Sequence, residues 1–247
     1  MAKSIHLSSG KTERVEFASG GQRVVGILHL PFPSTTTVER IVITCHGFMS
    51  SKDSDKYLQI AERFSSQGIG VLRFDFRGSG ESEGSVDLLS NRIADLAAAI
   101  EFVIGRGFKS IGVLGSSLGG TTAILAAAAT SKVKALVTWS TPLQFVELFE
   151  SILPSDVKGY QLGTDRVRED LKSSEFVKDL SKYSITESLK RISRILIVHC
   201  KGDAVVPWTQ AKIIFENARE PKQLKVFEGG DHQLLDPYMR RTAIELS

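Results

Sequence analysis

A serine between two glycines is the strongest candidate for chemistry in this 247-residue sequence. Ser117 lies in a Gly-x-Ser-x-Gly pattern, after the apolar run Ile111–Leu114 and before the alanine-rich run Thr121–Ala129. A serine on such a tight strand-to-helix turn, a nucleophile elbow, projects its hydroxyl from the carboxyl edge of a sheet. The backbone N–H of Leu118 would then lie at a helix N-terminus, where partial positive charge could stabilise an oxyanion.

Two other interpretations of the glycine-rich turn stay open. It could be a structural turn into a buried helix, with no chemistry of its own. Gly115 and Gly120 also have the spacing of a phosphate-binding loop, but Thr121 stands where that motif needs lysine.

A serine nucleophile needs a base, and the base needs a carboxylate that orients it. Asp203 follows the apolar run Ile195–Cys200, and His232 follows the run Leu224–Phe227 and a pair of glycines. Both therefore come just after the carboxyl end of an expected strand, where open α/β sheets place their sites. The order serine, aspartate, histidine is also the order of the α/β-hydrolase triad.

Other residues compete for the two supporting roles. Asp231 is adjacent to His232, so its side chain diverges from the base, and we interpret it as a turn residue. The expected strand that ends at Trp139 is followed by no carboxylate until Glu147. The other histidines fit the role of base less well. His6 lies near the N-terminus, His29 and His199 lie within expected strands as packed or structural residues, and His46 is expected to brace its loop.

The elements that must position these residues alternate between short β-rich runs and longer helical patterns. This rhythm predicts an α/β fold, with a mostly parallel sheet and helices on both of its faces. An opening hairpin adds an antiparallel edge. The expected strands are Glu13–Ala18, Val24–Leu30, Ile41–Cys45, Ile69–Phe74, Ile111–Leu114, Ala135–Trp139, Ile195–Cys200 and Leu224–Phe227. The expected helices are Asp55–Gln67, Asn91–Gly105, Leu118–Thr130, Thr209–Ala218 and Leu235–Leu246.

The rhythm breaks once, between Thr141 and Ile192. A connection of this length is unusual in a compact domain. We predict a single domain over residues 1–247, in which residues 142–191 form a small cap inserted after the sixth strand. A decorated crossover helix is the alternative. The aromatic residues Trp139, Phe145, Phe149 and Trp208 could line a substrate pocket, or pack as ordinary core and cap.

Over its whole length the sequence resembles the α/β-hydrolase superfamily, and that resemblance predicts an eight-stranded sheet. His46-Gly47-Phe48 stands where the family places its second oxyanion donor, so the resemblance implies that the N–H of Phe48 pairs with that of Leu118. Asp75–Ser82 matches a loop common in the family after the fourth strand. Within the superfamily the sequence is most similar to small carboxylesterases of the cinnamoyl (feruloyl) esterase type.

These features predict a serine hydrolase that cleaves carboxylic esters through an acyl-enzyme. Ser117 would be the nucleophile, His232 the base, and Asp203 the carboxylate that orients the base. The same triad also suits a thioesterase, a peptidase or an acyltransferase, because fold and triad do not determine the substrate. A binding protein that kept the fold would be expected to have a broken triad, and this one is intact. We expect no cofactor and a small-molecule ester as the partner.

Composition excludes several other classes. Lys and Arg total 31 against 28 Asp and Glu, and no basic run appears, so nucleic acid binding is not expected. The cysteines Cys45 and Cys200 lie in apolar runs and are interpreted as buried thiols. Metal-ligand motifs, a secretory signal and a membrane span are not evident, so we expect a cytoplasmic protein. The oligomeric state stays undetermined.

Overall fold

The computed structural model describes residues 11–31, 39–84, 88–143 and 174–247. Its eight strands form one sheet in the order β1-β2-β4-β3-β5-β6-β7-β8. β1 pairs with β2 and β2 with β4 in antiparallel fashion, and all the other pairs are parallel. The predicted α/β fold, its opening hairpin and its mostly parallel eight-stranded sheet are confirmed. The strands are β1 Thr12–Ser19, β2 Gln22–His29, β3 Arg40–Cys45, β4 Gly70–Phe74, β5 Ser110–Ser116, β6 Val133–Trp139, β7 Ile195–Cys200 and β8 Lys222–Phe227.

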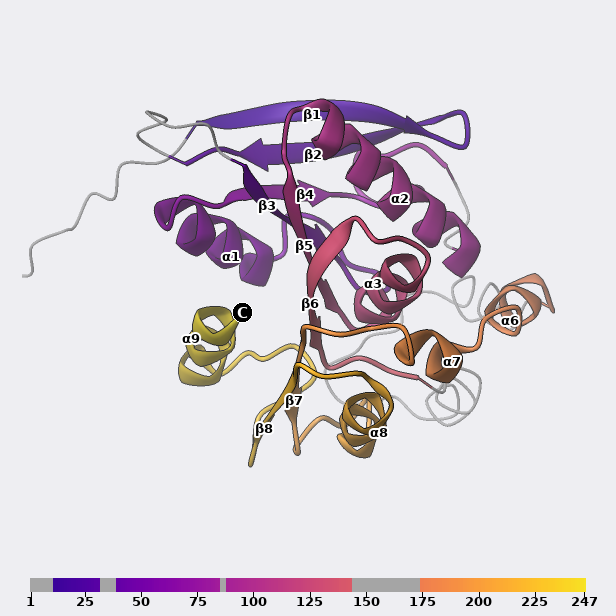
Figure 1. The fold of residues 1–247 in the computed structure, drawn as a ribbon, viewed down its shortest axis with the longest axis vertical. Helices are drawn as coiled ribbons and strands as arrows, with labels where there is room; N and C mark the ends of the chain where they lie inside the picture. Colours follow the sequence, from indigo (N-terminus) through magenta and orange to yellow (C-terminus); the bar gives the residue numbers. More distant parts are fainter. Residues whose placement is uncertain (1–10, 32–38, 85–87, 144–173) are drawn as a thin grey trace, which may run out of the picture.

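Helices cover both faces of this sheet, as the near-continuous apolar strands predict. α1 (Asp55–Ser66) and α9 (Pro237–Leu246) lie on one face, whereas α2 (Leu89–Gly105), α3 (Leu118–Ala128) and α8 (Thr209–Asn217) lie on the other (Figure 1). Each face has its own buried core. The α1 and α9 side is built around Tyr57, Ile60 and Trp139, and the opposite side includes Leu96, Ile124 and Ile214.

The long connection after β6 lies largely outside the described residues. Its described end contains two short helices that the sequence pattern did not predict, α6 (Ser174–Leu180) and α7 (Ile185–Leu189). α6 contacts α2, and α7 contacts α3 and α8, so this part packs along the helical layer of the domain. The cap over residues 142–191 therefore stays a prediction.

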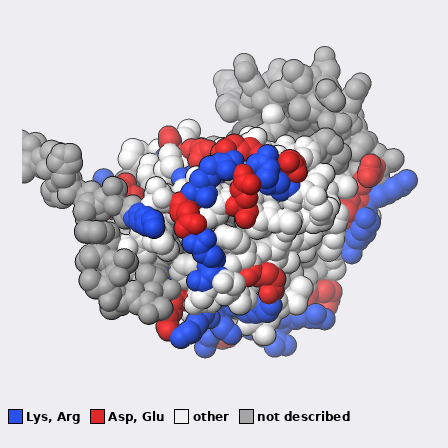
Figure 2. All heavy atoms as spheres, turned by 90° about the horizontal axis from the view of Figure 1, so that it is seen from above, with Lys and Arg blue, Asp and Glu red and all other residues white. Residues whose placement is uncertain are grey.

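Charged side chains cover the outer strand of the hairpin. Arg14 pairs with Glu16 at 2.6 Å and with Glu81 at 3.1 Å, and Glu13 pairs with Arg106 at 2.6 Å. Figure 2, which looks down on the molecule from above the view of Figure 1, shows blue and red atoms alternating in a band across the surface. Charges on an edge strand hinder its pairing with the edge of another molecule.

The parallel strands bring their carboxyl ends to one edge of the sheet. The ends of β3, β5, β7 and β8 lead into the segments that carry His46, Ser117, Asp203 and His232, respectively. Residues more than a hundred positions apart in the sequence can therefore meet at this edge.

Candidate active site

Ser117 lies on a strained turn between β5 and α3. Its φ is +55°, a conformation that costs energy for a residue with a side chain and that is tolerated where the surrounding structure enforces it. Glycines make the turn possible: a Cβ on Gly119 would lie 2.1 Å from the carbonyl oxygen of Cys45, and one on Gly115 would lie 2.3 Å from that of Gly119. The N–H of Ser117 donates to the carbonyl of Trp139 at 2.8 Å, which ties the turn to β6.

The structure brings the three predicted residues into one hydrogen-bonded row. Nε2 of His232 lies 3.0 Å from Oγ of Ser117, and Nδ1 of the same ring lies 2.8 Å from Oδ2 of Asp203. His232 and Asp203 are buried, whereas Ser117 is only partly buried. This is the geometry in which an imidazole could take the hydroxyl proton while a carboxylate holds the ring.

The carboxylate of Asp203 is held on both of its oxygens. Oδ1 accepts the backbone N–H groups of Val205 and Val206 at 2.9 and 2.8 Å. Oδ2 faces two imidazoles, since Nε2 of the fully buried His199 lies 3.3 Å away in addition to Nδ1 of His232. Burial alone raises the pKa of the Asp203 carboxyl, but the hydrogen bonds from His199 and His232 outweigh it and hold that pKa well below its usual value.

His199 contacts the site although the sequence suggested only a packed strand histidine. Its Nε2 also lies 2.9 Å from the carbonyl oxygen of Val206. Because both neighbours of Nε2 are acceptors, this nitrogen carries the proton. The one available signal was spacing, since His199 precedes Asp203 by four residues across the end of β7.

The loop after β3 lies directly against the serine. A Cβ built on Gly47 would be 3.2 Å from Cβ of Ser117, so a side chain at this position would crowd the hydroxyl. The Phe48 peptide follows immediately, and Leu118 begins α3 on the other side of the serine. Phe48 and Leu118 thus both lie on segments that adjoin Ser117, as expected of two candidate oxyanion donors.

A buried histidine braces this loop. Nδ1 of His46 lies 2.8 Å from the carbonyl oxygen of Gly47, and Nε2 accepts the N–H of Phe76 at 3.0 Å. The guanidinium of Arg92 donates to the His46 carbonyl oxygen. Burial, followed by the nearby charge of Arg92, lowers the pKa of His46 to about 3, so the ring is neutral and acts as a structural brace.

The loop after β4 is held by a buried ion pair. Asp75 accepts the backbone N–H of Lys52 at 2.7 Å and its ammonium at 2.9 Å. Arg77 pairs with Asp95 of α2 at 2.6 Å. The Asp75–Lys52 pair is buried and joins the loop after β4 to the segment that follows the His46 loop.

The described residues include two of the four candidate pocket residues, Trp139 and Trp208. Trp139 has no exposed surface and packs with Tyr57 and Leu234 in the α1 and α9 core, so the prediction that it lines a pocket is wrong. Trp208 is partly buried, and the ammonium of Lys201 lies 5.4 Å from the centre of its ring. Phe145 and Phe149 lie outside the described residues.

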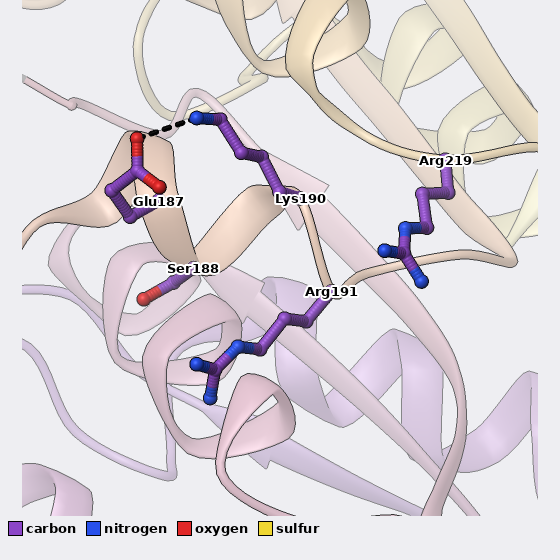
Figure 3. Close-up of a pocket in the computed structure, with 5 residues that line it drawn as sticks. All are labelled: Glu187, Ser188, Lys190, Arg191 and Arg219. Carbon is purple, nitrogen blue, oxygen red and sulfur yellow. Dashed lines mark hydrogen bonds and ion pairs between the residues drawn. The ribbon is translucent and has the colours of Figure 1, made fainter.

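A separate hollow of about 330 Å³ lies where β7 and β8 begin, at the sheet edge opposite the triad candidates. Figure 3 shows its lining, in which Lys190 turns to pair with Glu187 at 2.6 Å while the two arginines extend separately. The lining residues are Glu187, Ser188, Lys190, Arg191 and Arg219. Within the described ranges no cluster of three metal-ligating side chains occurs, and no helix has the length and apolar character that a membrane span requires.

The sheet order and the strand–serine–helix turn at Ser117 are those of the α/β-hydrolase fold. A family model described as serine aminopeptidase, S33, matches residues 36–162, and the chain belongs to this family.

Relatives and solved structures agree with this class. The chain is 26% identical over 218 residues to the uncharacterized protein YfhR of Salmonella typhimurium, covering 82% of this chain and 66% of the relative, slightly less than two thirds of its length. It is 28% identical over 196 residues to lysophosphatidylserine lipase ABHD12 of Danio rerio, covering 74% of this chain and 48% of the lipase. The fold is similar to that of Est1E from Butyrivibrio proteoclasticus, solved with ferulic acid, at a TM-score of 0.76 and 18% identity, covering 94% and 97%. The fold is also similar to that of an esterase domain from Rhodothermus marinus, at a TM-score of 0.74 and 24% identity, covering 96% of this chain and 95% of that domain.

Proposed function

We propose that this protein hydrolyses carboxylic esters through an acyl-enzyme on Ser117. The observation that carries the proposal is the unbroken row from Asp203 through His232 to Ser117, with contacts of 2.8 and 3.0 Å. The esterase and lipase names of its neighbours support an ester as the substrate.

In the first half-reaction, Nε2 of His232 accepts the hydroxyl proton as Oγ of Ser117 attacks the ester carbonyl. Asp203 keeps the proton on Nδ1 and stabilises the imidazolium that forms. The backbone N–H groups of Phe48 and Leu118 donate to the tetrahedral oxyanion. Collapse expels the alcohol, which takes the proton from Nε2.

In the second half-reaction, His232 removes a proton from water as that water attacks the acyl carbonyl. The tetrahedral intermediate uses the same two amides, and its collapse returns the proton to Oγ of Ser117 and releases the carboxylic acid. Each oxyanion donor typically contributes about 10²–10³ in rate. Since both donors here are backbone groups, side-chain substitution would test them poorly.

The test is covalent labelling combined with substrate hydrolysis. A fluorophosphonate should add to Ser117, as located by mass spectrometry of peptides, and Ser117→Ala should abolish labelling and ester turnover while the circular dichroism spectrum is unchanged. Ester turnover by Ser117→Ala close to that of the parent would refute the assignment.

Substrate class needs a separate comparison. The panel should include p-nitrophenyl esters of increasing chain length, methyl ferulate, an acyl-CoA and an aminoacyl p-nitroanilide. We expect the esters to be hydrolysed fastest. A preference for the anilide would favour a peptidase, in agreement with the name of the family model, and hydrolysis of the thioester alone would favour a thioesterase.

A further inference from the structure

A buried lysine connects the two loops that carry the proposed nucleophile and base. Lys56, in the first turn of α1, is 6% exposed. Its ammonium donates to Oγ of Ser116 at 2.9 Å and to Oε1 of Gln233 at 3.1 Å. Ser116 immediately precedes Ser117, and Gln233 immediately follows His232.

The sheet provides no direct connection between these two loops. Ser117 follows β5 and His232 follows β8, and the strand order places β6 and β7 between them. The hydrogen bond between His232 and Ser117 therefore spans a gap across two strands. The Lys56 ammonium spans the same gap one residue away from each partner.

The same helical turn also reaches the third segment of the site. Oη of Tyr57 donates to the carbonyl oxygen of Cys45 at 3.1 Å, and Cys45 is the last residue of β3 before the His46 loop. Two consecutive residues of α1 thus contact three segments of the site. Lys56 bonds the side chains beside Ser117 and His232, and Tyr57 bonds the backbone that leads into the His46 loop.

This arrangement costs stability. Lysine is rarely buried without a paired carboxylate, and in the described part of the chain no carboxylate lies within ion-pair distance of Lys56. Burial, and then repulsion from Arg240 of α9, lowers the pKa of Lys56 to about 8, against partial compensation by Asp231 and Asp203. A methionine of similar length would fill this space without the cost of burying a charge.

We propose that Lys56 is a positioning residue, which holds the Ser117 and His232 loops at their reactive separation by bonding Ser116 and Gln233. The inference rests on the proposed function. Its energetic basis is that displacing a reacting group by about 1 Å can reduce the rate by about 10²-fold.

The experiment compares Lys56→Met with Arg63→Met, which removes an exposed cation from the same helix. We expect Lys56→Met to reduce kcat, and the rate of fluorophosphonate labelling, by about 10–100-fold, with KM within about two-fold of the parent. The thermal midpoint should be unchanged or higher. Arg63→Met should behave as the parent.

A double-mutant cycle tests whether Lys56 acts through Ser116. Ser116→Ala should slow the enzyme, and adding it to Lys56→Met should cause little further loss, because the two changes remove the same contact. Losses in kcat that multiply independently would contradict this.

The outcomes separate the two hypotheses. If the parent is not labelled at Ser117, the proposed function fails. If the parent is labelled and Lys56→Met is labelled equally fast, the function stands and the role of Lys56 is refuted. A slower variant with a lower thermal midpoint would make Lys56 a structural residue and would also overturn the proposal.

Discussion

At the scale of single residues, the structure lowers the pKa of three groups around the serine, with opposite effects on their charge. Hydrogen-bond donors lower the pKa of Asp203, which favours its charged form. Burial lowers the pKa of His46 and of Lys56, which favours their neutral forms. A charged carboxylate, a neutral brace and a marginally charged ammonium therefore coexist around one serine.

Asp203→Asn should keep the shape of the acid but remove its charge. The amide cannot stabilise an imidazolium in the same way, and it can present a donor to Nδ1 and favour the wrong tautomer, so we expect kcat to fall by about 10³–10⁴. Steady-state kinetics on the best p-nitrophenyl ester would measure it.

Asp231→Asn is the matched control for that change. Oδ1 of Asp231 accepts the backbone N–H of Gln233 at 2.8 Å, as expected of a turn residue. We expect less than about ten-fold loss, because Asp203 already occupies the Nδ1 side of the base. An equal effect of the two substitutions would argue against Asp203 as the acid.

Lys56 should make the free energy of unfolding depend on pH in the alkaline range. Its pKa is about 8 in the folded chain and about 10.4 in an unfolded one, so between these values the unfolded state binds more protons. The folded state should therefore gain stability as the pH rises from about 8 towards about 10.4, and the penalty should be complete below that range.

Urea unfolding at several pH values would measure this contribution as the difference between the parent and Lys56→Met. The stability advantage of the variant should be largest near pH 7 and shrink towards pH 10. A difference that stays constant with pH would mean that the ammonium is not buried as described.

At the scale of elements, close approaches of backbone determine which glycines the elbow needs. A Cβ on Gly119 would meet the backbone of Cys45 and His46, whereas one on Gly120 would lie 1.9 Å from Oγ1 of Thr141. The first collision involves main chain on β3, and the second involves a side chain that can be removed.

Gly119→Ala should therefore be strongly destabilised with no simple rescue. Gly120→Ala should also be destabilised, but adding Thr141→Gly should restore a substantial part of the loss, because the methyl group then occupies the vacated space. Thermal melts of the three single variants and of the two double variants that combine each alanine with Thr141→Gly would check this. Equal rescue of Gly119→Ala by Thr141→Gly would contradict the geometry.

The sequence could predict the features that local patterns encode, but not the contacts that only the packed fold creates. Ser117, Asp203 and His232 were predicted because each follows a strand in a recognisable local pattern. The contacts of Lys56 were not, because Ser116 and Gln233 are 60 and 177 positions away and only packing brings them together.

Two smaller differences have similar causes. β5 continues to Ser116 beyond its apolar run, because Gly115 and Ser116 pair with Thr138 and Trp139 of β6. Trp139 was assigned to a pocket because a strand that is apolar on both faces does not reveal which face a given side chain occupies.

At the scale of the whole molecule, the sheet has an edge at β1 that ion pairs cover. We expect replacement of Glu13, Arg14 and Glu16 together by valine to cause self-association, since the strand would become apolar and able to pair with another copy.

Sedimentation velocity at increasing protein concentration would detect this association. Replacing the exposed charges Lys212 and Glu216 of α8 by alanine provides the control, because that helix lies away from the hairpin edge and pairs these residues at 3.9 Å. If the valine variant sediments as the parent does at every concentration, the charged band does not protect the edge.

The two cysteines offer a native measure of how the site opens. Cys45 ends β3 and Cys200 ends β7, and burial raises the pKa of their thiols to about 12 and about 11. Neither can react with a disulfide reagent until its strand end separates from its neighbours. The labelling rate of each thiol in the unmodified protein would therefore report how often the carboxyl ends of β3 and β7 separate from their neighbours.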